Sequence, residues 1–233
     1  MNKNHPIKAV LFDLDGTLID TAPDFIRIIN AMCRENNHPI PSDEAIREQV
    51  SAGARAMVKL MYGQKMAQVV DNDPQLLAHR QEFLDAYEAD ICIDSRLFEG
   101  LDELLHDLEN QAIAWGIVTN KPRYLAENLL DCLNLTQRCA VLVCPEDVKN
   151  PKPYPEPMFL ASKNLNIKPE NCVYVGDHIR DIQAGNNAGM LTILAGYGYI
   201  PPEDKADLTT WGADLMVDNT AKLYSTLKDL IKK

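Results

Sequence analysis

The sequence Asp13-Leu14-Asp15-Gly16-Thr17-Leu18-Ile19-Asp20 follows directly after the apolar run Ala9-Val10-Leu11-Phe12. An apolar run that ends in acidic residues is typical of a buried strand with two carboxylates at its end. In open α/β sheets, ligands bind beyond the carboxyl ends of the strands. Asp13 and Asp15 are therefore candidate functional residues.

Asp13 and Asp15 could serve one site in two ways. If the strand persists, residues two apart point to the same side, and both carboxylates can share one metal ion and one substrate. If the chain turns at Gly16, which permits a turn without steric cost, Asp15 can offer its backbone carbonyl to the metal and keep its carboxyl free. The alternatives are a pair of solvated acids and a calcium loop. Calcium loops have glycine at their sixth position, whereas Gly16 is the fourth residue when Asp13 is counted as the first.

Length and composition predict a globular protein of the cytoplasm. The chain has 233 residues, of which 46% are hydrophobic, enough for one large domain or a core with an insertion. Its net charge of -11, without a Lys/Arg block, makes nucleic acid and anionic membranes poor candidate partners. The six cysteines form no Cys-x-x-Cys pair and lie mostly in apolar runs, as expected of buried thiols in a reducing compartment. Asp13 also ends the first apolar run too early for a signal peptide or membrane span.

Between residues 21 and about 95, apolar residues recur at the spacing of helices. Ser42 is expected to cap one helix, with Asp43 and Glu44 in its first turn. A break at 51–54 precedes another helix, and a longer one follows Asp73-Pro74, where proline has its preferred place. The longer helix is expected to bury a face made of Leu76, Leu77, Phe83, Leu84 and Tyr87.

From residue 101 onward, short apolar strands alternate with helices, which is typical of a parallel sheet. The expected strands cover residues 113–118, 140–144, 172–175, 191–194 and 215–217. The N-terminal strand must join this sheet, because alone it could not satisfy its backbone hydrogen bonds. The chain is therefore predicted to be an α/β protein with a core at 1–20 and 96–233 and a helical insertion at 21–95. Two short connections would allow the insertion to act as a hinged lid.

Two further motifs offer groups that bind phosphate. Thr119-Asn120-Lys121 follows an expected strand, and its hydroxyl, amide and backbone N–H groups could donate to phosphate oxygens. The alternative is an ordinary turn. Asn150-Pro151-Lys152-Pro153-Tyr154-Pro155 surrounds one lysine with three prolines, which limits where its ammonium can reach. The alternatives are a proline-rich surface loop and a role for Lys149 instead.

Gly176-Asp177-His178-Ile179-Arg180-Asp181 follows another strand and begins a helix. Asp177 is well placed to be a magnesium ligand, because carboxylate oxygens suit that ion and the strand ends near the first acids. The alternative is that Asp177 only caps the helix. His178 is expected to pack rather than to bind the ion, because magnesium prefers oxygen ligands.

In their order and spacing, these four motifs resemble the signatures of the haloacid dehalogenase-like (HAD) phosphatases. The resemblance covers nearly the whole chain and implies a Rossmann-like core with a small α-helical cap inserted after the first motif. It implies that Asp13 is the nucleophile and Asp15 the general acid-base group. It departs from the family only at His178, where relatives often carry a further Asp.

The resemblance also implies a magnesium cofactor and a phosphate site. Mg²⁺ would be held by the Asp13 carboxylate, the Asp15 carbonyl and Asp177. Asp181 would orient the metal waters or Lys152. The groups expected to meet the phosphoryl oxygens are Lys152, Thr119 and Asn120.

Within the family, the chain is most similar to the N-acetylmuramic acid 6-phosphate phosphatases of the phosphoglycolate phosphatase-like branch. Segments such as Gly53-Ala54-Arg55-Ala56-Met57-Val58 and Trp211-Gly212-Ala213-Asp214 carry this similarity. It implies hydrolysis of a small carboxylated phosphate ester in bacterial cell-wall recycling, with phosphoglycolate as the alternative substrate. Arg55 is expected to bind that carboxylate if its loop faces the core. The other interpretation is a helix–helix turn with a solvated arginine.

Three other functions fit parts of the pattern. A signalling receiver domain also phosphorylates an Asp on a parallel α/β fold, but its acceptor is expected after the third strand and it lacks a helical insertion. A sugar-phosphate mutase of the same family would keep every motif and differ only in where the phosphoryl group goes next. A non-catalytic interaction protein is disfavoured, because no catalytic position has been lost.

Overall fold

The computed structural model describes residues 5–201 and 203–232, so the predicted core segment 1–20 begins outside the described residues. Within these ranges, six strands form one parallel sheet in the order β5-β4-β1-β6-β7-β8. The strands are β1 (Ala9–Phe12), β4 (Ala114–Val118), β5 (Leu142–Val143), β6 (Cys172–Gly176), β7 (Leu191–Ala195) and β8 (Leu215–Val217). The predicted α/β fold with a parallel sheet is confirmed. The prediction of a strand at 140–144 was too long, because β5 lies at the sheet edge and pairs only with β4.

β1 lies inside the sheet, between β4 and β6. All four of its side chains are fully buried, as expected of an apolar strand that is covered on both faces. Alternate side chains point to opposite faces. Val10 and Phe12 belong to one apolar cluster with side chains of the helices at 101–110, 123–132 and 220–231, whereas Ala9 and Leu11 belong to another with side chains of the helices at 156–165 and 179–188. The chain runs from β1 outward to β4 and β5 and then crosses to β6, so the strand order reverses beside β1. Such a reversal leaves a crevice at the carboxyl ends of the strands.

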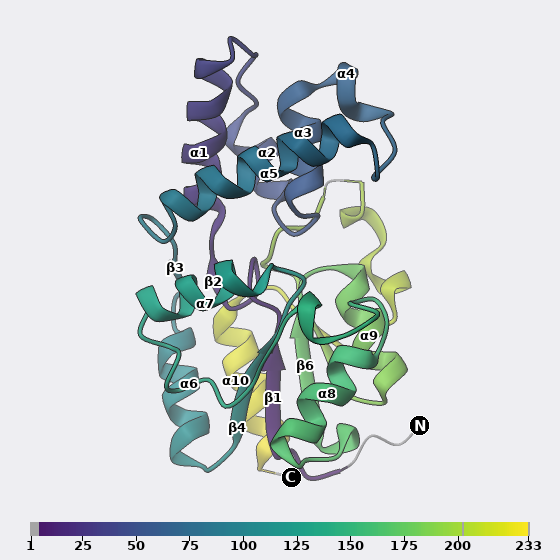
Figure 1. The fold of residues 1–233 in the computed structure, drawn as a ribbon. Helices are drawn as coiled ribbons and strands as arrows, with labels where there is room; N and C mark the ends of the chain where they lie inside the picture. Colours follow the sequence, from purple (N-terminus) through teal and green to yellow (C-terminus); the bar gives the residue numbers. More distant parts are fainter. Residues whose placement is uncertain (1–4, 202, 233) are drawn as a thin grey trace.

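Helices cover both faces of this sheet (Figure 1). They are α6 (Leu101–Asn110), α7 (Arg123–Cys132), α8 (Glu156–Leu165), α9 (Ile179–Ala188) and α10 (Thr220–Ile231). The described residues also form short 3-10 helices, namely η1 (Pro145–Asp147), η2 (Pro169–Asn171) and η3 (Lys205–Trp211). No helix in the described ranges is both long enough and apolar enough to cross a membrane. All six cysteines are free thiols, and four of them are buried.

A group of helices lies beyond the carboxyl ends of the strands, at the top of Figure 1. Its members are α1 (Ala22–Glu35), α2 (Asp43–Gln49), α3 (Ala54–Tyr62), α4 (Gln64–Ala67) and α5 (Pro74–Ala89). The predicted cap at Ser42 is confirmed, since its hydroxyl accepts a hydrogen bond from the Ala45 amide. Asp73, for which no cap was predicted, accepts from two amides at the start of α5. The predicted place of Leu77 on the buried face was wrong, because this side chain is exposed. The boundaries of an inserted domain at 21 and 95 stay a prediction.

The chain enters and leaves this helical group through two paired connections. β2 (Ile19–Asp20) pairs antiparallel with β3 (Arg96–Leu97). With two residues each, these strands are too short to show the alternation of apolar and polar residues from which a strand is predicted. Next to it, the buried carboxylate of Asp24 accepts hydrogen bonds from the Ser95 amide and hydroxyl and from the Asp94 amide. Arg27 also pairs with Asp24 at 2.6 Å. Asp24 therefore ties the outgoing connection to the returning one.

We expect Asp24→Ala to lower the free energy of unfolding at pH 7 by about 3–5 kcal/mol, because it removes a buried carboxylate and leaves the donors of Ser95 and Asp94 without an acceptor. Chemical denaturation measures this loss. Asp90→Ala is the matched control, because Asp90 pairs with the same Arg27 but is 58% exposed, so its loss should cost under about 1 kcal/mol. Equal losses for the two variants would contradict the role of Asp24.

The same comparison should depend on pH. Burial raises the pKa of Asp24, but hydrogen bonds from Ser95 and Arg27 outweigh this effect, so its pKa lies below the usual value. A carboxyl whose pKa is lowered by folding stabilises the protein above its unfolded pKa of about 3.9 and loses this contribution as the pH falls further. The difference between parent and Asp24→Ala should therefore shrink below about pH 4.

Candidate active site

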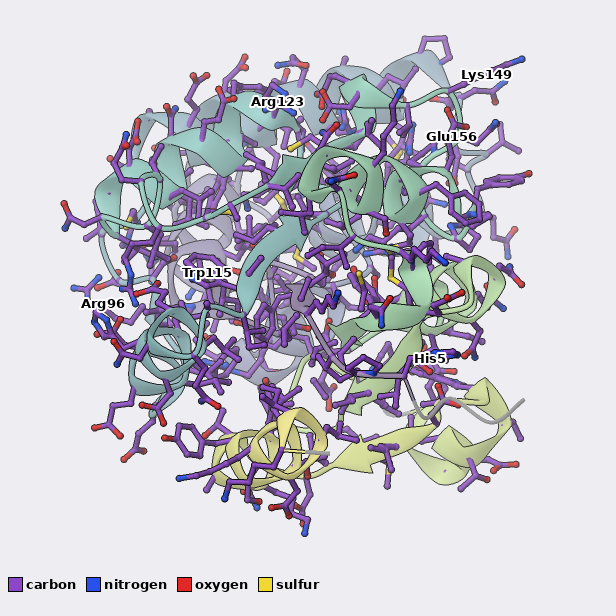
Figure 2. The ribbon with its side chains drawn as sticks, turned by 90° about the horizontal axis from the view of Figure 1, so that it is seen from below. His5, Arg96, Trp115, Arg123, Lys149 and Glu156 are labelled. Atoms are coloured by element: carbon purple, nitrogen blue, oxygen red, sulfur yellow. The ribbon has the colours of Figure 1, made fainter. Side chains whose placement is uncertain are left out.

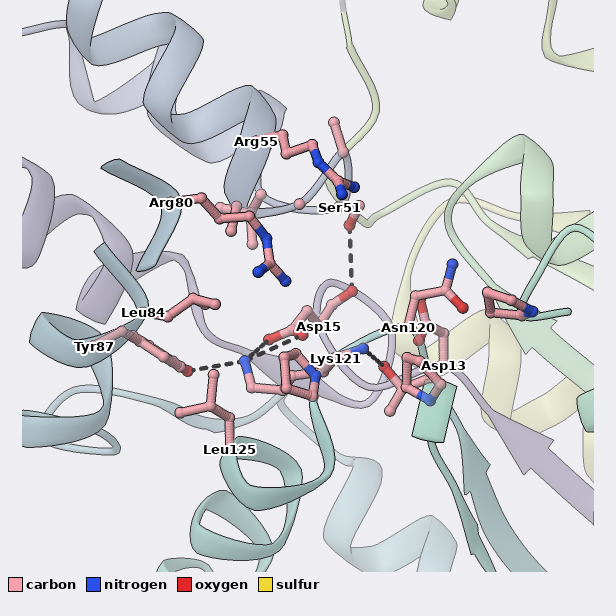
Figure 3. Close-up of a pocket in the computed structure, with 18 of the residues that line it drawn as sticks. Asp13, Asp15, Ser51, Arg55, Arg80, Leu84, Tyr87, Asn120, Lys121 and Leu125 are labelled. Atoms are coloured by element: carbon pink, nitrogen blue, oxygen red, sulfur yellow. Dashed lines mark hydrogen bonds and ion pairs between the residues drawn. The ribbon is translucent and has the colours of Figure 1, made fainter. Parts of the chain in front are cut away.

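A cavity of about 490 Å³ lies between the carboxyl ends of the strands and the helical group. Figure 3 shows side chains that enter it from both sides. The sheet side supplies Asp13, Asp15, Thr119, Asn120 and Lys121, and the helical side supplies residues 51–55, Arg80, Leu84 and Tyr87. Of the residues predicted from the sequence, five line this cavity, namely Asp13, Asp15, Arg55, Thr119 and Asn120. Lys152, Asp177 and Asp181 are buried beside Asp13 and are not part of the lining.

Asp13 and Asp15 point to different partners. The chain turns at Gly16, whose φ of +82° favours glycine, so the interpretation with a turn is the one that the structure adopts. The Asp13 carboxylate is nearly buried and lies 2.9 Å from the ammonium of Lys152. The Asp15 carboxylate instead accepts from the Lys121 ammonium at 2.9 Å and from the Thr21 hydroxyl at 2.7 Å. Each acid therefore has its own cation.

Three carboxylates meet beside Asp13. Oxygen atoms of Asp13, Asp177 and Asp181 lie within 4.8 Å of one another, and all three residues are buried. Lys152 contacts two of them, at 2.9 Å from Asp13 and 2.7 Å from Asp181. A Cβ atom at Gly16 would lie 2.2 Å from Asp177, so only glycine lets the backbone approach this closely.

The charge at this cluster is not balanced by the described residues. Burial, together with the negative charges of Asp13 and Asp181, raises the pKa of Asp177 to about 7, against hydrogen bonds from Ser51 and the Tyr199 amide. Unpaired buried carboxylates are costly, and a divalent cation with oxygen ligands would offset that cost. The described residues therefore fit a metal ion.

His178 and Asp181 fix the start of α9. His178 occupies the cap position and its Nδ1 accepts from the Arg180 amide at 3.2 Å, while the Asp181 carboxylate accepts from the His178 amide at 3.0 Å. The interpretation of Asp177 as a mere helix cap was therefore wrong. Burial, together with the charge of Arg180, lowers the pKa of His178 to about 3, so the capping ring is neutral.

Lys152 has a fully buried side chain that also donates to the Tyr174 hydroxyl at 2.9 Å. Lys149, the competing candidate, is exposed at the edge of the molecule near Glu156 (Figure 2). The amide group of Asn120 donates to the Lys152 carbonyl at 3.0 Å, so this amide positions the lysine loop as well as lining the cavity. The Oδ1 atom of Asn120 is buried and has no hydrogen-bond partner among the described residues.

Thr119 lines the cavity as expected, and its hydroxyl oxygen accepts from the Lys121 amide at 3.1 Å. The Lys121 amide, which was predicted to donate to phosphate, therefore donates to Thr119 instead, and the hydroxyl proton of Thr119 stays available.

The roles of Lys121, Ser51 and Arg80 were not predicted from the sequence. Lys121 stood next to Thr119-Asn120 in the motif, and its position after a strand was the available signal. Ser51 donates its hydroxyl to Asp177 at 2.7 Å, and Arg180 donates to the Ser51 carbonyl. These contacts bring the break at 51–54 against the core, and Arg55 lines the cavity beside it.

Arg80 gave no sequence signal, because one arginine in a charged helix is usually solvated. It lines the same cavity as Arg55.

Comparisons with known proteins agree with this geometry. Residues 10–195 match the model of the haloacid dehalogenase-like hydrolase family. The chain is 47% identical to N-acetylmuramic acid 6-phosphate phosphatase of Pseudomonas putida (95% of this chain, 96% of the relative) and 44% identical to that of Pseudomonas aeruginosa (97% and 96%). It is 40% identical to a phosphoglycolate phosphatase of Xanthomonas campestris pv. campestris (93% and 95%).

The fold is also similar to solved structures. A HAD family hydrolase of Deinococcus radiodurans has a TM-score of 0.72 at 23% identity, covering 97% of this chain and 96% of that one. A structure from Lactobacillus delbrueckii subsp. bulgaricus has a TM-score of 0.80 at 24% identity, with 96% and 99% covered. At these identities the likeness concerns the fold.

The imbalance of charge around Asp177 leads to a test of metal binding. We expect Asp177→Asn to raise the free energy of unfolding at pH 8 in metal-free buffer by on the order of 1–3 kcal/mol, because a carboxyl whose pKa is raised by folding destabilises the protein as the pH rises through that range. Added Mg²⁺ should stabilise the parent, by about 2.7 kcal/mol at a hundredfold excess over Kd, and leave the variant unchanged.

Thermal melts with and without Mg²⁺ measure both effects. Asp229→Asn, an exposed acid of α10, is the control and should respond to Mg²⁺ like the parent. An Asp177→Asn protein that Mg²⁺ still stabilises fully would refute the metal site.

Proposed function

This chain belongs to the haloacid dehalogenase-like hydrolase family, and we propose that it is a Mg²⁺-dependent phosphatase of the cytoplasm that hydrolyses a small carboxylated phosphate monoester. One observation carries the proposal. Two acids two residues apart share one cavity, yet each is bound to a different lysine, Asp13 to Lys152 and Asp15 to Lys121. Such separation suits a nucleophile and a general acid-base group acting on the same substrate.

The proposed reaction has two displacements. An oxygen of the Asp13 carboxylate attacks phosphorus, the bond to the ester oxygen breaks, and Asp15 gives that oxygen its proton. Asp15 then takes a proton from water, the water oxygen attacks phosphorus, and the bond to Asp13 breaks to release phosphate and restore the carboxylate. Lys121 and Thr21, which both contact the Asp15 carboxylate, hold it in place for these proton transfers.

Negative charge on the phosphoryl oxygens needs donors that are already in position. Lys152 is held between Asp13 and Asp181, so its ammonium reaches the phosphate without reorganisation. Thr119 and Asn120 line the same side of the cavity and complete the phosphate site. When bound at the Asp13 carboxylate, the Asp15 carbonyl and Asp177, Mg²⁺ supplies charge that reduces repulsion between an anionic nucleophile and an anionic phosphate.

We further propose that the helical segment 21–95 is a cap on a core made of 1–20 and 96–233. It covers the cavity, and its turn at Ser51 contacts the core at Asp177. Core groups touch only the phosphate, which every ester shares, so residues of the cap select the leaving group.

N-Acetylmuramic acid 6-phosphate is the proposed substrate, which places the enzyme in cell-wall recycling. Two relatives above 40% identity carry that activity in their names, and Arg55 lines the cavity where a lactyl carboxylate would need a cation. Phosphoglycolate is the alternative, because the relative at 40% identity is named for it. A mutase would return an isomer of its substrate instead of free phosphate.

We expect Asp13→Asn to abolish phosphate release while the fold stays intact, because an amide has nearly the same shape but is a poor nucleophile. A phosphate-release assay with circular dichroism measures both. Asp85→Asn, at an exposed position of α5, should keep full activity. Turnover of Asp13→Asn within tenfold of the parent, only about 1.4 kcal/mol of barrier, would reject Asp13 as nucleophile.

The substrate proposal predicts a higher kcat/KM for N-acetylmuramic acid 6-phosphate than for N-acetylglucosamine 6-phosphate, which lacks the lactyl carboxylate. Arg55→Ala should remove most of this difference in kcat/KM. We expect the difference to be roughly ten- to a hundredfold, because a charge-assisted hydrogen bond contributes about 1.5–3 kcal/mol. Equal rates on both sugars would oppose the proposal, and a clear preference for phosphoglycolate would select the alternative.

A further inference from the structure

Arg80 on α5 enters the cavity from the same side as Arg55 on α3. Figure 3 shows both guanidinium groups directed into the space above Asp15, on the side away from the sheet. The described residues give neither arginine a hydrogen bond or an ion pair. Among the other arginines, the described residues give an ion pair to Arg27, Arg47, Arg123 and Arg138, but none to Arg34, Arg96 and Arg180.

The lack of a partner is costly at Arg80, which is only partly exposed. Burial lowers its pKa, and the positive charge of Arg55 lowers it further. Asp71, which also lines the cavity, is 71% exposed at its side chain and forms its ion pair with Lys59 at 3.0 Å, whereas the charge of Arg55 acts on it without an ion pair. Arg55 is exposed and Arg80 is half-buried, and in a protein with a net charge of -11 two neighbouring arginines that have no ion pair among the described residues indicate a binding site for an anion.

The chemistry of the cavity indicates which anion this is. Phosphate has its own groups on the sheet side, around Lys152 and Thr119, so a second anion must be a different part of the same substrate. A guanidinium offers a planar pair of donors that matches a carboxylate. Leu84 lies one turn beyond Arg80 on the same face of α5 and also lines the cavity, so an apolar group next to the carboxylate has a surface to contact.

We propose that Arg80 and Arg55 together bind the carboxylate of the substrate, and that Arg80 is a specificity-determining residue of the phosphatase. This inference rests on the proposed function. The cavity volume of about 490 Å³ lies within the range of about 300–1,000 Å³ typical of sites for larger ligands, so it has room for a sugar between the phosphate groups and the arginines.

The test compares Arg80→Met with Arg34→Met, an exposed arginine of α1 outside the cavity. Arg80→Met should lower kcat/KM for N-acetylmuramic acid 6-phosphate by about ten- to a hundredfold, and change kcat/KM for N-acetylglucosamine 6-phosphate by less than about threefold. Arg34→Met should change neither. Arg80→Lys, which keeps the charge but loses the paired donors, should fall between parent and Arg80→Met.

Binding separates recognition from catalysis. In an Asp13→Asn background, Arg80→Met should weaken the calorimetric Kd for N-acetylmuramic acid 6-phosphate by about the same factor. The double variant Arg55→Ala/Arg80→Met should lose less than the product of the single losses, because both side chains bind one carboxylate. Circular dichroism confirms that each variant is folded.

The outcomes distinguish the inference from the function on which it rests. Suppose that the parent prefers carboxylated esters. If Arg80→Met then lowers kcat/KM equally for both sugar phosphates, or lowers it for neither of them, the role of Arg80 is overturned and the phosphatase proposal stands. If the parent releases phosphate from no carboxylated ester, both are overturned. If the parent prefers phosphoglycolate and Arg80→Met selectively loses it, the role of Arg80 stands with the alternative substrate.

Discussion

The ammonium group of Lys152 is buried between the carboxylates of Asp13 and Asp181, and the arrangement of the site depends on these two contacts. A buried charge is stable only when it is paired. If the loop that carries Lys152 moved away from the end of β1 or the start of α9, buried carboxylates would be left without a cation. The Tyr174 hydroxyl, which accepts from Lys152, donates in turn to the carbonyl of Val118 on β4. One lysine therefore connects segments that are far apart in the sequence.

The helical segment is attached by the same physical rule. The Asp24 carboxylate is buried, and its hydrogen bonds from Ser95 join the two connections through which the chain leaves and returns. A second tie forms at Ser51, whose hydroxyl and carbonyl both contact the core, at Asp177 and Arg180. Polar groups that lose water must find partners, and here those partners lie across the boundary between helices and sheet. The cavity lies between the strand ends and the helical group, and Ser51 belongs to its lining.

The charges in that cavity are divided between its two sides. Acids with buried lysines gather at the strand ends, where phosphate chemistry needs both signs within reach. Arg55 and Arg80, which form no ion pair with any residue that the structure describes, lie on the helical side, where they can meet a part of the substrate that differs between esters. A fold with this division can change its substrate through residues of the helices and keep the chemistry at the sheet unchanged.

The sequence by itself determined the parallel sheet, the capped helices and the set of acids at the strand ends. These features follow from local signals, such as the apolar run before Asp13 and the cap residue Ser42, and from the rule that parallel strands end at one edge. The tertiary structure alone decided that Asp15 pairs with Lys121, that Leu77 faces water, and that Arg80 enters the cavity. Each of these depends on contacts between residues distant in the chain, and neither spacing nor composition encodes which distant partner will be near.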